Sequence, residues 1–247
     1  MPKKIAIAHP GKIGDALWSL PTVKELCRQN DAVADFYTSS LCRPMKDLVE
    51  AQSYIYQMVE CAPYNILSIG CGVQPWEMPI SELGYVKCYQ LGFKETPDCI
   101  IGEWIAYHAG LPQEIGSQVV YENIPVFHHE GEYVAVASRG NDFADLLREF
   151  SKRCPIPCIE IGIPGQAIEA GLNLTSNSML KMASIIAGAR AFVGLMSAPL
   201  VIANGFSIPK IVPCLLGNGS GDLRHLLRSP KHHYLVNPDF NEMLSLI

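Results

Sequence analysis

Short apolar runs alternate with longer amphipathic segments along most of the chain. The first run, residues 3–8, leads through a turn with a proline and a glycine into a helical pattern. Strand and helix patterns continue to alternate after this opening, at the spacing of crossover units, which is typical of a parallel sheet. The expected strands are residues 3–8, 32–38, 55–59 and 65–70, the expected helices are residues 15–28, 41–51 and 100–110, and residues 72–96 are irregular.

The alternation breaks at residues 123–131 and starts again with a new apolar strand. The expected strands of this second part are residues 133–137, 158–162, 191–193 and 210–214, and the expected helices are residues 143–153, 177–187 and 199–204. We therefore predict an α/β fold with two Rossmann-like parallel-sheet domains, residues 1–128 and 129–247. Folds of this kind bind ligands in the crevice beyond the carboxyl ends of their strands, which predicts a cleft between the two domains.

Charge and hydropathy exclude two classes of protein. The net charge is −5 and the basic residues are scattered rather than gathered in a stripe, which argues against nucleic acid as a partner. No apolar run approaches the roughly 20 residues of a membrane span, and the first residues lead directly into a strand rather than a signal peptide. We expect a cytoplasmic protein, with peripheral membrane contact only through an acceptor.

Cysteine and histidine spacing gives no sign of a metal site. The nine cysteines are spread along the chain without a CxxC pair, so we expect reduced, mostly buried thiols. Two histidine pairs, His128-His129 and His232-His233, stand in polar stretches that predict loops.

The first motif that can carry chemistry is the turn after the first strand, HPGKIGDALWSLP at residues 9–21. A glycine-bearing turn before a helix brings the backbone close to a ligand and offers free N–H groups to an anion. Asp15 stands at about the N-cap, where its carboxylate either caps the helix, worth ~1 kcal/mol, or takes part in catalysis. The pattern lacks both the dinucleotide-binding and the Walker signatures, so nicotinamide and ATP-hydrolysis functions lose support.

The second motif follows a strand of the second domain, at residues 191–203. It combines a glycine turn, Ser197 at the cap and Pro199 at the first helical position, which together indicate a helix start. The exposed amides of such a start can hold a diphosphate. A capped, buried helix without any ligand is the alternative.

Together these segments resemble the heptosyltransferase-like family, glycosyltransferase family nine. The family's first strand leads into a G-D-x-x-x-x-x-P helix, which Gly14, Asp15 and Pro21 reproduce. Residues 34–63 and 182–213 also look like the corresponding strand-helix-strand segments of the family, so the resemblance spans both halves.

The resemblance implies a B-type glycosyltransferase fold that transfers a sugar with inversion, without a metal or a cofactor. It implies a nucleotide diphosphate donor similar to ADP-heptose and a saccharide acceptor such as a lipopolysaccharide or another surface glycan. It places the acceptor in the N-terminal domain, with Asp15 as general base, and the nucleotide sugar in the C-terminal domain. The residues it assigns to donor binding are Gly14, Arg139, Glu169, Gly194, Ser197, Ala198, Pro199 and Leu200.

The chain departs from the family pattern at the donor side. Leu195-Met196 stand where the family has Asn-Asp, Ala198 where it has a second glycine, and Val201 where it has histidine. These changes remove polar side chains but leave the backbone amides of residues 198–200 for an anion. Arg139 is either the cation beside the phosphates or a solvated surface residue, and Glu169 is either near the ribose or an ordinary loop residue.

Three functions remain open at this point. The first is an active inverting glycosyltransferase. The second is a catalytically degenerate relative that serves as a binding or partner protein, which the residues at 196 and 201 favour. The third is a different enzyme on the same two-domain plan, such as a nucleotide-sugar epimerase or a phosphorylase.

Overall fold

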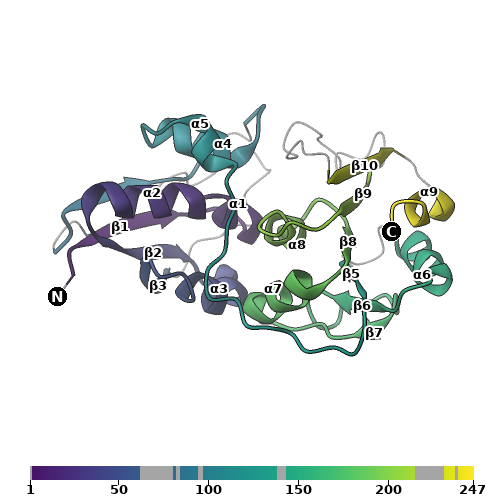
Figure 1. The fold of residues 1–247 in the computed structure, drawn as a ribbon. Helices are drawn as coiled ribbons and strands as arrows, with labels where there is room; N and C mark the ends of the chain where they lie inside the picture. Colours follow the sequence, from purple (N-terminus) through teal and green to yellow (C-terminus); the bar gives the residue numbers. More distant parts are fainter. Residues whose placement is uncertain are drawn as a thin grey trace. The chain divides into compact units, whose positions relative to one another are not determined.

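The computed structural model describes residues 2–61, 80–81, 84–93, 97–137, 143–214, 231–236 and 239–247. The chain divides into two compact units, unit 1 at Met1–Asn123 and unit 2 at Ile124–Ile247. The division falls at the start of the stretch where the strand and helix pattern breaks. Each unit has its own parallel sheet (Figure 1). The strand expected at residues 65–70 lies outside the described residues.

Unit 1 is built on a parallel sheet in the order β3-β2-β1-β4. Its strands are β1 (Lys4–His9), β2 (Val33–Ser39), β3 (Ile55–Cys61) and β4 (Lys87–Gln90). The apolar side chains that made β1 and β2 predictable from sequence, among them Ile5, Ile7 and Phe36, are completely buried. The pattern did not predict β4, because its residues are partly exposed and carry no apolar run.

The helices of unit 1 are α1 (Ile13–Trp18), α2 (Leu20–Asn30), η1 (Ser40–Met45, a 3₁₀ helix), α3 (Lys46–Glu50), α4 (Ile101–His108) and α5 (Gln113–Gly116). The single helix expected over residues 15–28 is thus two helices separated at Ser19. Pro21 has no N–H to donate to the carbonyl four residues before it, which interrupts the helical hydrogen bonds there. Figure 1 shows α2 lying against β1 and β2.

Unit 2 has a parallel sheet in the order β10-β9-β8-β5-β6-β7. Its strands are β5 (Val134–Ala137), β6 (Cys158–Ile161), β7 (Leu172–Asn173), β8 (Ala191–Gly194), β9 (Lys210–Cys214) and β10 (His232–Val236). The four inner strands are buried at every position, and all four were expected. The loop expected at His232-His233 is wrong, since both residues belong to the edge strand β10. A half-buried edge strand tolerates polar residues, which hide it from an apolar pattern.

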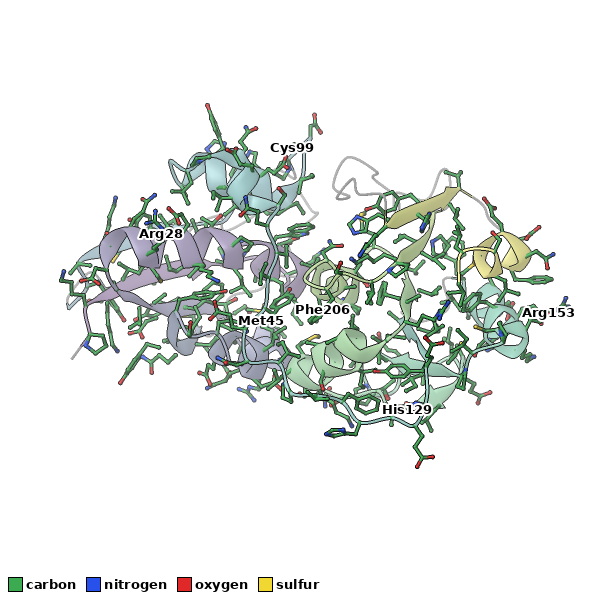
Figure 2. The ribbon with its side chains drawn as sticks, viewed as in Figure 1. Arg28, Met45, Cys99, His129, Arg153 and Phe206 are labelled. Atoms are coloured by element: carbon green, nitrogen blue, oxygen red, sulfur yellow. The ribbon has the colours of Figure 1, made fainter. Side chains whose placement is uncertain are left out.

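The helices of unit 2 are α6 (Ala144–Arg153), α7 (Met179–Gly188), α8 (Ala198–Ala203) and α9 (Phe240–Leu244). Leu147 and Phe150 of α6 pack with Met243 of α9 in the core of the unit. Arg153, at the end of α6, lies over the ring of Phe240, 4.1 Å from its centroid (Figure 2). Within the described ranges, no helix combines the length and the apolar character that crossing a membrane needs.

Candidate active site

The turn between β1 and α1 is held tightly to the sheet. The Gly11 N–H donates to His9 Nδ1 over 3.1 Å, and Cys42 Sγ donates to the Gly11 carbonyl oxygen over 3.4 Å. A Cβ atom at position 11 would stand 2.5 Å from His9 Cε1 and 3.1 Å from Asp15 Cβ. Only glycine leaves room for this close approach. The turn therefore fixes the backbone between the end of β1 and Asp15.

Asp15 lies in the first turn of α1, as its third residue, and is half-buried. The expected N-cap position is wrong: the N-cap is Lys12, whose side chain makes no cap hydrogen bond. Asp15 therefore does not cap α1 from the N-cap position, although a carboxylate in a first turn interacts favourably with the helix dipole. Gly14, the second residue of α1, is also half-buried.

The negative charge of Asp15 acts on the thiol of Cys42. Burial, with a smaller contribution from the negative charge of Asp15, raises the pKa of the Cys42 thiol to about 11. The thiol is therefore protonated near neutral pH and donates its hydrogen bond to the turn. Asp15 supplies the carboxylate of this segment, and a carboxylate can act as a general base.

His9 is a residue of this turn that sequence reasoning did not single out. Its side chain is completely buried, and burial lowers its pKa to about 4, so the ring is neutral. The ring packs edge-to-face on Phe93, with centroids 6.3 Å apart, and Nε2 has no hydrogen-bond partner in the described part of the chain. The available signal was a histidine placed directly between a buried strand and a Pro-Gly turn.

The turn between β8 and α8 differs from its expected form. Ser197 is the N-cap residue by position, but its hydroxyl donates to the Leu195 carbonyl oxygen over 3.3 Å and caps no helical amide. Pro199 is the second residue of α8 rather than the first. Gly194 is required by strand packing, because a Cβ there would stand 2.8 Å from Ala137 Cβ.

The expected cradle of three amides at residues 198–200 is also reduced. Leu200 N–H already donates to the Ser197 carbonyl oxygen over 3.0 Å, and Pro199 has no N–H. Within this stretch of the described chain, Ala198 keeps a backbone N–H that no helical bond uses. Leu195 and Val201, which replace polar residues of the family pattern, are both buried. Fewer groups are left at this turn to hold an anion than the pattern suggested.

The other two donor-site candidates are Arg139 and Glu169. Arg139 lies outside the described residues. Glu169 is exposed, has a left-handed backbone (φ 62°), and lies three residues before the first residue of β7. Ser197 follows the carboxyl end of β8. All strands of this sheet are parallel, so the carboxyl end of β8 and the amino end of β7 point in opposite directions along the strands. This placement does not favour a ribose contact by Glu169.

Over the described ranges, no group of three or more histidine, cysteine, aspartate or glutamate side chains is arranged to hold a metal ion. Eight of the cysteines are free, and Cys27, Cys42, Cys158 and Cys214 among them are buried. The absence of a metal from the reaction stays a prediction.

Neither a protein-family model nor a curated protein matches this sequence. Solved structures do match. Heptosyltransferase WaaC of E. coli, in a structure with ADP, is similar with a TM-score of 0.57 and 11% identity over 99% of this chain and 96% of WaaC. A glycosyltransferase of family 9 from Veillonella parvula is similar with a TM-score of 0.60 and 10% identity, over 98% of this chain and 87% of that one.

The chain has the heptosyltransferase fold. This likeness confirms the prediction of two Rossmann-like parallel-sheet domains. The heptosyltransferase fold also occurs in TibC from enterotoxigenic E. coli, described as an iron-containing dodecameric glycosyltransferase, with a TM-score of 0.60 and 13% identity over 94% of this chain. The chain spans 63% of the length of TibC. Identities this low show a shared fold alone.

Proposed function

We propose that this protein is an inverting glycosyltransferase that moves a sugar from a nucleotide diphosphate donor to a saccharide acceptor. The observation that carries the proposal is Asp15: a half-buried carboxylate in the first turn of α1, directly after the carboxyl end of β1, inside a heptosyltransferase fold. A donor similar to ADP-heptose and an acceptor such as a lipopolysaccharide or another surface glycan fit the resemblance at Gly14, Asp15 and Pro21.

In the proposed reaction the Asp15 carboxylate accepts the proton of the acceptor hydroxyl. The hydroxyl oxygen forms the new bond to the anomeric carbon as the bond to the diphosphate breaks, and the nucleotide diphosphate leaves. One displacement of this kind inverts the anomeric configuration. General-base catalysis of this sort contributes roughly 10²–10⁴ in rate. The proposed reaction needs no metal.

We assign the diphosphate to the turn after β8. Ala198 N–H supports this assignment as an unused amide, and Arg139 supplies a positive charge in the sequence just after β5. Transfer also requires that the acceptor hydroxyl beside Asp15 reaches the sugar held at this turn.

The test replaces Asp15 with asparagine. Asp15→Asn keeps the size of the side chain but cannot accept the proton, so we expect kcat to fall by about 10² or more. Asp47→Asn is a matched control, because Asp47 is also a half-buried aspartate in the first turn of a short helix. Sugar transfer is measured with each variant, and the melting temperature checks that the fold is intact. Equal turnover of Asp15→Asn and the wild type would show that Asp15 is not the base.

A second function, that of a catalytically degenerate binding protein, is favoured by the buried apolar residues Leu195 and Val201. Titration calorimetry with ADP, UDP, GDP and their sugars separates the two functions. A transferase binds at least one of these nucleotides and turns over its sugar. Absence of binding by all of them, together with absence of transfer, supports the degenerate relative.

A further inference from the structure

A neutral histidine inside a protein core needs a reason, because its polar atoms lose their contacts with water. The His9 side chain is completely buried, and its Nε2 has no hydrogen-bond partner among the described residues. An unpartnered buried donor costs stability, and a leucine of similar branching would avoid that cost. Leucine, however, has no acceptor atom, whereas His9 Nδ1 accepts a hydrogen bond from the Gly11 N–H.

This hydrogen bond also determines the form of the ring. Since Nδ1 accepts a hydrogen bond from the Gly11 N–H, the proton of the neutral ring is on Nε2. Burial lowers the pKa of His9 to about 4, which keeps the ring in this form across the neutral pH range. The ring edge also packs on Phe93. His9 is therefore a fixed acceptor and not a group that exchanges protons during a reaction.

The His9 ring and Asp15 both border the space beside the Gly11 backbone. A Cβ at Gly11 would stand 2.9 Å from His9 Nδ1 and 3.1 Å from Asp15 Cβ. Two further bonds tie the same turn to the rest of unit 1. Thr38 Oγ1 donates to the His9 carbonyl oxygen over 3.0 Å, and Cys42 Sγ donates to that of Gly11. Because Gly11 precedes Asp15 by four residues, a shift of its amide displaces the backbone that leads into the first turn of α1.

We propose that His9 is a positioning residue for Asp15: its ring holds the Gly11 amide and so sets where the Asp15 carboxylate stands beyond β1. The expected effect on the rate of sugar transfer rests on the proposed function. The expected effect on the position of the Asp15 carboxylate does not.

The experiment compares His9→Asn with His9→Leu. The two side chains have nearly the same shape, but asparagine places an oxygen close to the position of Nδ1 and leucine has no acceptor. We expect His9→Leu to lower kcat about tenfold or more, with the KM for the nucleotide sugar nearly unchanged. His9→Asn restores most of the lost rate. Equal losses in the two variants would overturn the proposal, since the acceptor would then be irrelevant.

Two NMR measurements test, without any assay of turnover, whether the His9 ring holds the Gly11 amide and positions Asp15. Hydrogen exchange at the Gly11 amide is expected to be slow in the wild type and in His9→Asn, and faster in His9→Leu. The carboxyl ¹³C resonance of Asp15 is expected to move in His9→Leu alone. If the wild type transfers no sugar, the proposed function fails, and these two measurements still support or overturn the positioning role. Unchanged exchange and an unmoved Asp15 resonance in His9→Leu overturn it.

Discussion

At the residue scale, Glu160 on β6 places a carboxylate in the interior of unit 2. Its buried carboxylate accepts the N–H groups of Ile168 and Ala170 over 2.6 and 3.0 Å. The carbonyl oxygens of the same two residues accept from Arg148 Nε and Ser151 Oγ of α6. Both polar groups of each residue are thus used, which explains how Glu169 between them is kept at a φ of 62°.

Replacing Glu160 with glutamine is expected to destabilise unit 2 by about 2–3 kcal/mol. The amide nitrogen of glutamine would face a backbone N–H, so one buried donor loses its acceptor and the charge that strengthens both bonds is lost. The measurements are the free energy of unfolding in urea and hydrogen exchange at the Ile168 and Ala170 amides. Glu149→Gln is the control, because Glu149 pairs with Arg153 at the exposed surface. Similar losses in both variants would contradict the role of Glu160.

The candidate site was only partly predictable from such residues. Asp15 was singled out because Gly14, Asp15 and Pro21 form a spaced motif, which is visible without coordinates, and its role stays a prediction. His9 and Glu160 were missed, because their meaning depends on which backbone amides face them, and Gly11 and Ala170 are brought there by folding. The amides of residues 198–200 were overestimated partly for the same reason, since the bond from the Leu200 N–H to Ser197 cannot be seen in sequence, whereas the missing N–H of Pro199 can.

At the element scale, α4 and α5 cross through a pair of glycines. A Cβ at Gly102 would overlap the Gly116 carbonyl oxygen and stand 3.0 Å from Trp18 Cε3, while a Cβ at Gly116 would overlap the Gly102 carbonyl oxygen. Neither glycine has a positive φ, so close backbone approach, not a turn, explains both residues. The crossing joins α4 and α5 next to α1, the helix that carries Asp15.

Gly102→Ala is therefore expected to lower the stability of unit 1 by roughly 2 kcal/mol or more. Alanine favours a helix interior by about 1 kcal/mol over glycine, but the overlap with backbone atoms cannot be relieved by a side-chain rotation. Thermal unfolding followed by circular dichroism measures the effect. Tyr107→Ala on the same helix is the control, since its side chain is 60% exposed and its loss should change stability little. A melting temperature of Gly102→Ala at or above that of the wild type would contradict this packing.

Whether an element could be predicted depended on its burial. The inner strands β5, β6, β8 and β9 are buried at every position, which gives apolar runs that a pattern detects. The missed strands β4, β7 and β10 are all at sheet edges, where one side of the strand has no neighbour and polar residues are tolerated. The break between α1 and α2 was missed because the sequence does not tell whether Pro21 lies within one long helix or near the start of a second one.

At the scale of the whole molecule, the alternation of strands and helices was enough to predict two parallel-sheet units. Each sheet is assembled from crossovers that restart after residues 123–131, and the repeat is independent of any single residue. The two units can be followed separately by spectroscopy. The tryptophans, Trp18, Trp76 and Trp104, all precede residue 124, so tryptophan fluorescence reports on unit 1.

This probe leads to a prediction about acid stability. The pKa of His9 is about 4 in the folded chain and near 6.5 in the unfolded chain, so the unfolded state binds the proton first as pH falls below 6.5. The stability of unit 1 should therefore be constant above that pH and fall by about 2 kcal/mol by pH 5, or roughly 5–10 °C in melting temperature. Carboxyl groups contribute much less in this window, about 0.1 kcal/mol each at pH 5, because in the unfolded chain they titrate near 4.

The melting temperature from tryptophan fluorescence is measured at pH 7 and at pH 5 for the wild type and for His9→Asn. Asparagine keeps an acceptor for Gly11 but has no proton to gain, so the variant should lose much less stability between these two values. The comparison cancels any acid effect that the two proteins share, such as titration of exposed histidines. An equal fall in both proteins would mean that protonation of His9 is not coupled to unfolding, and that its ring is open to water in the folded chain.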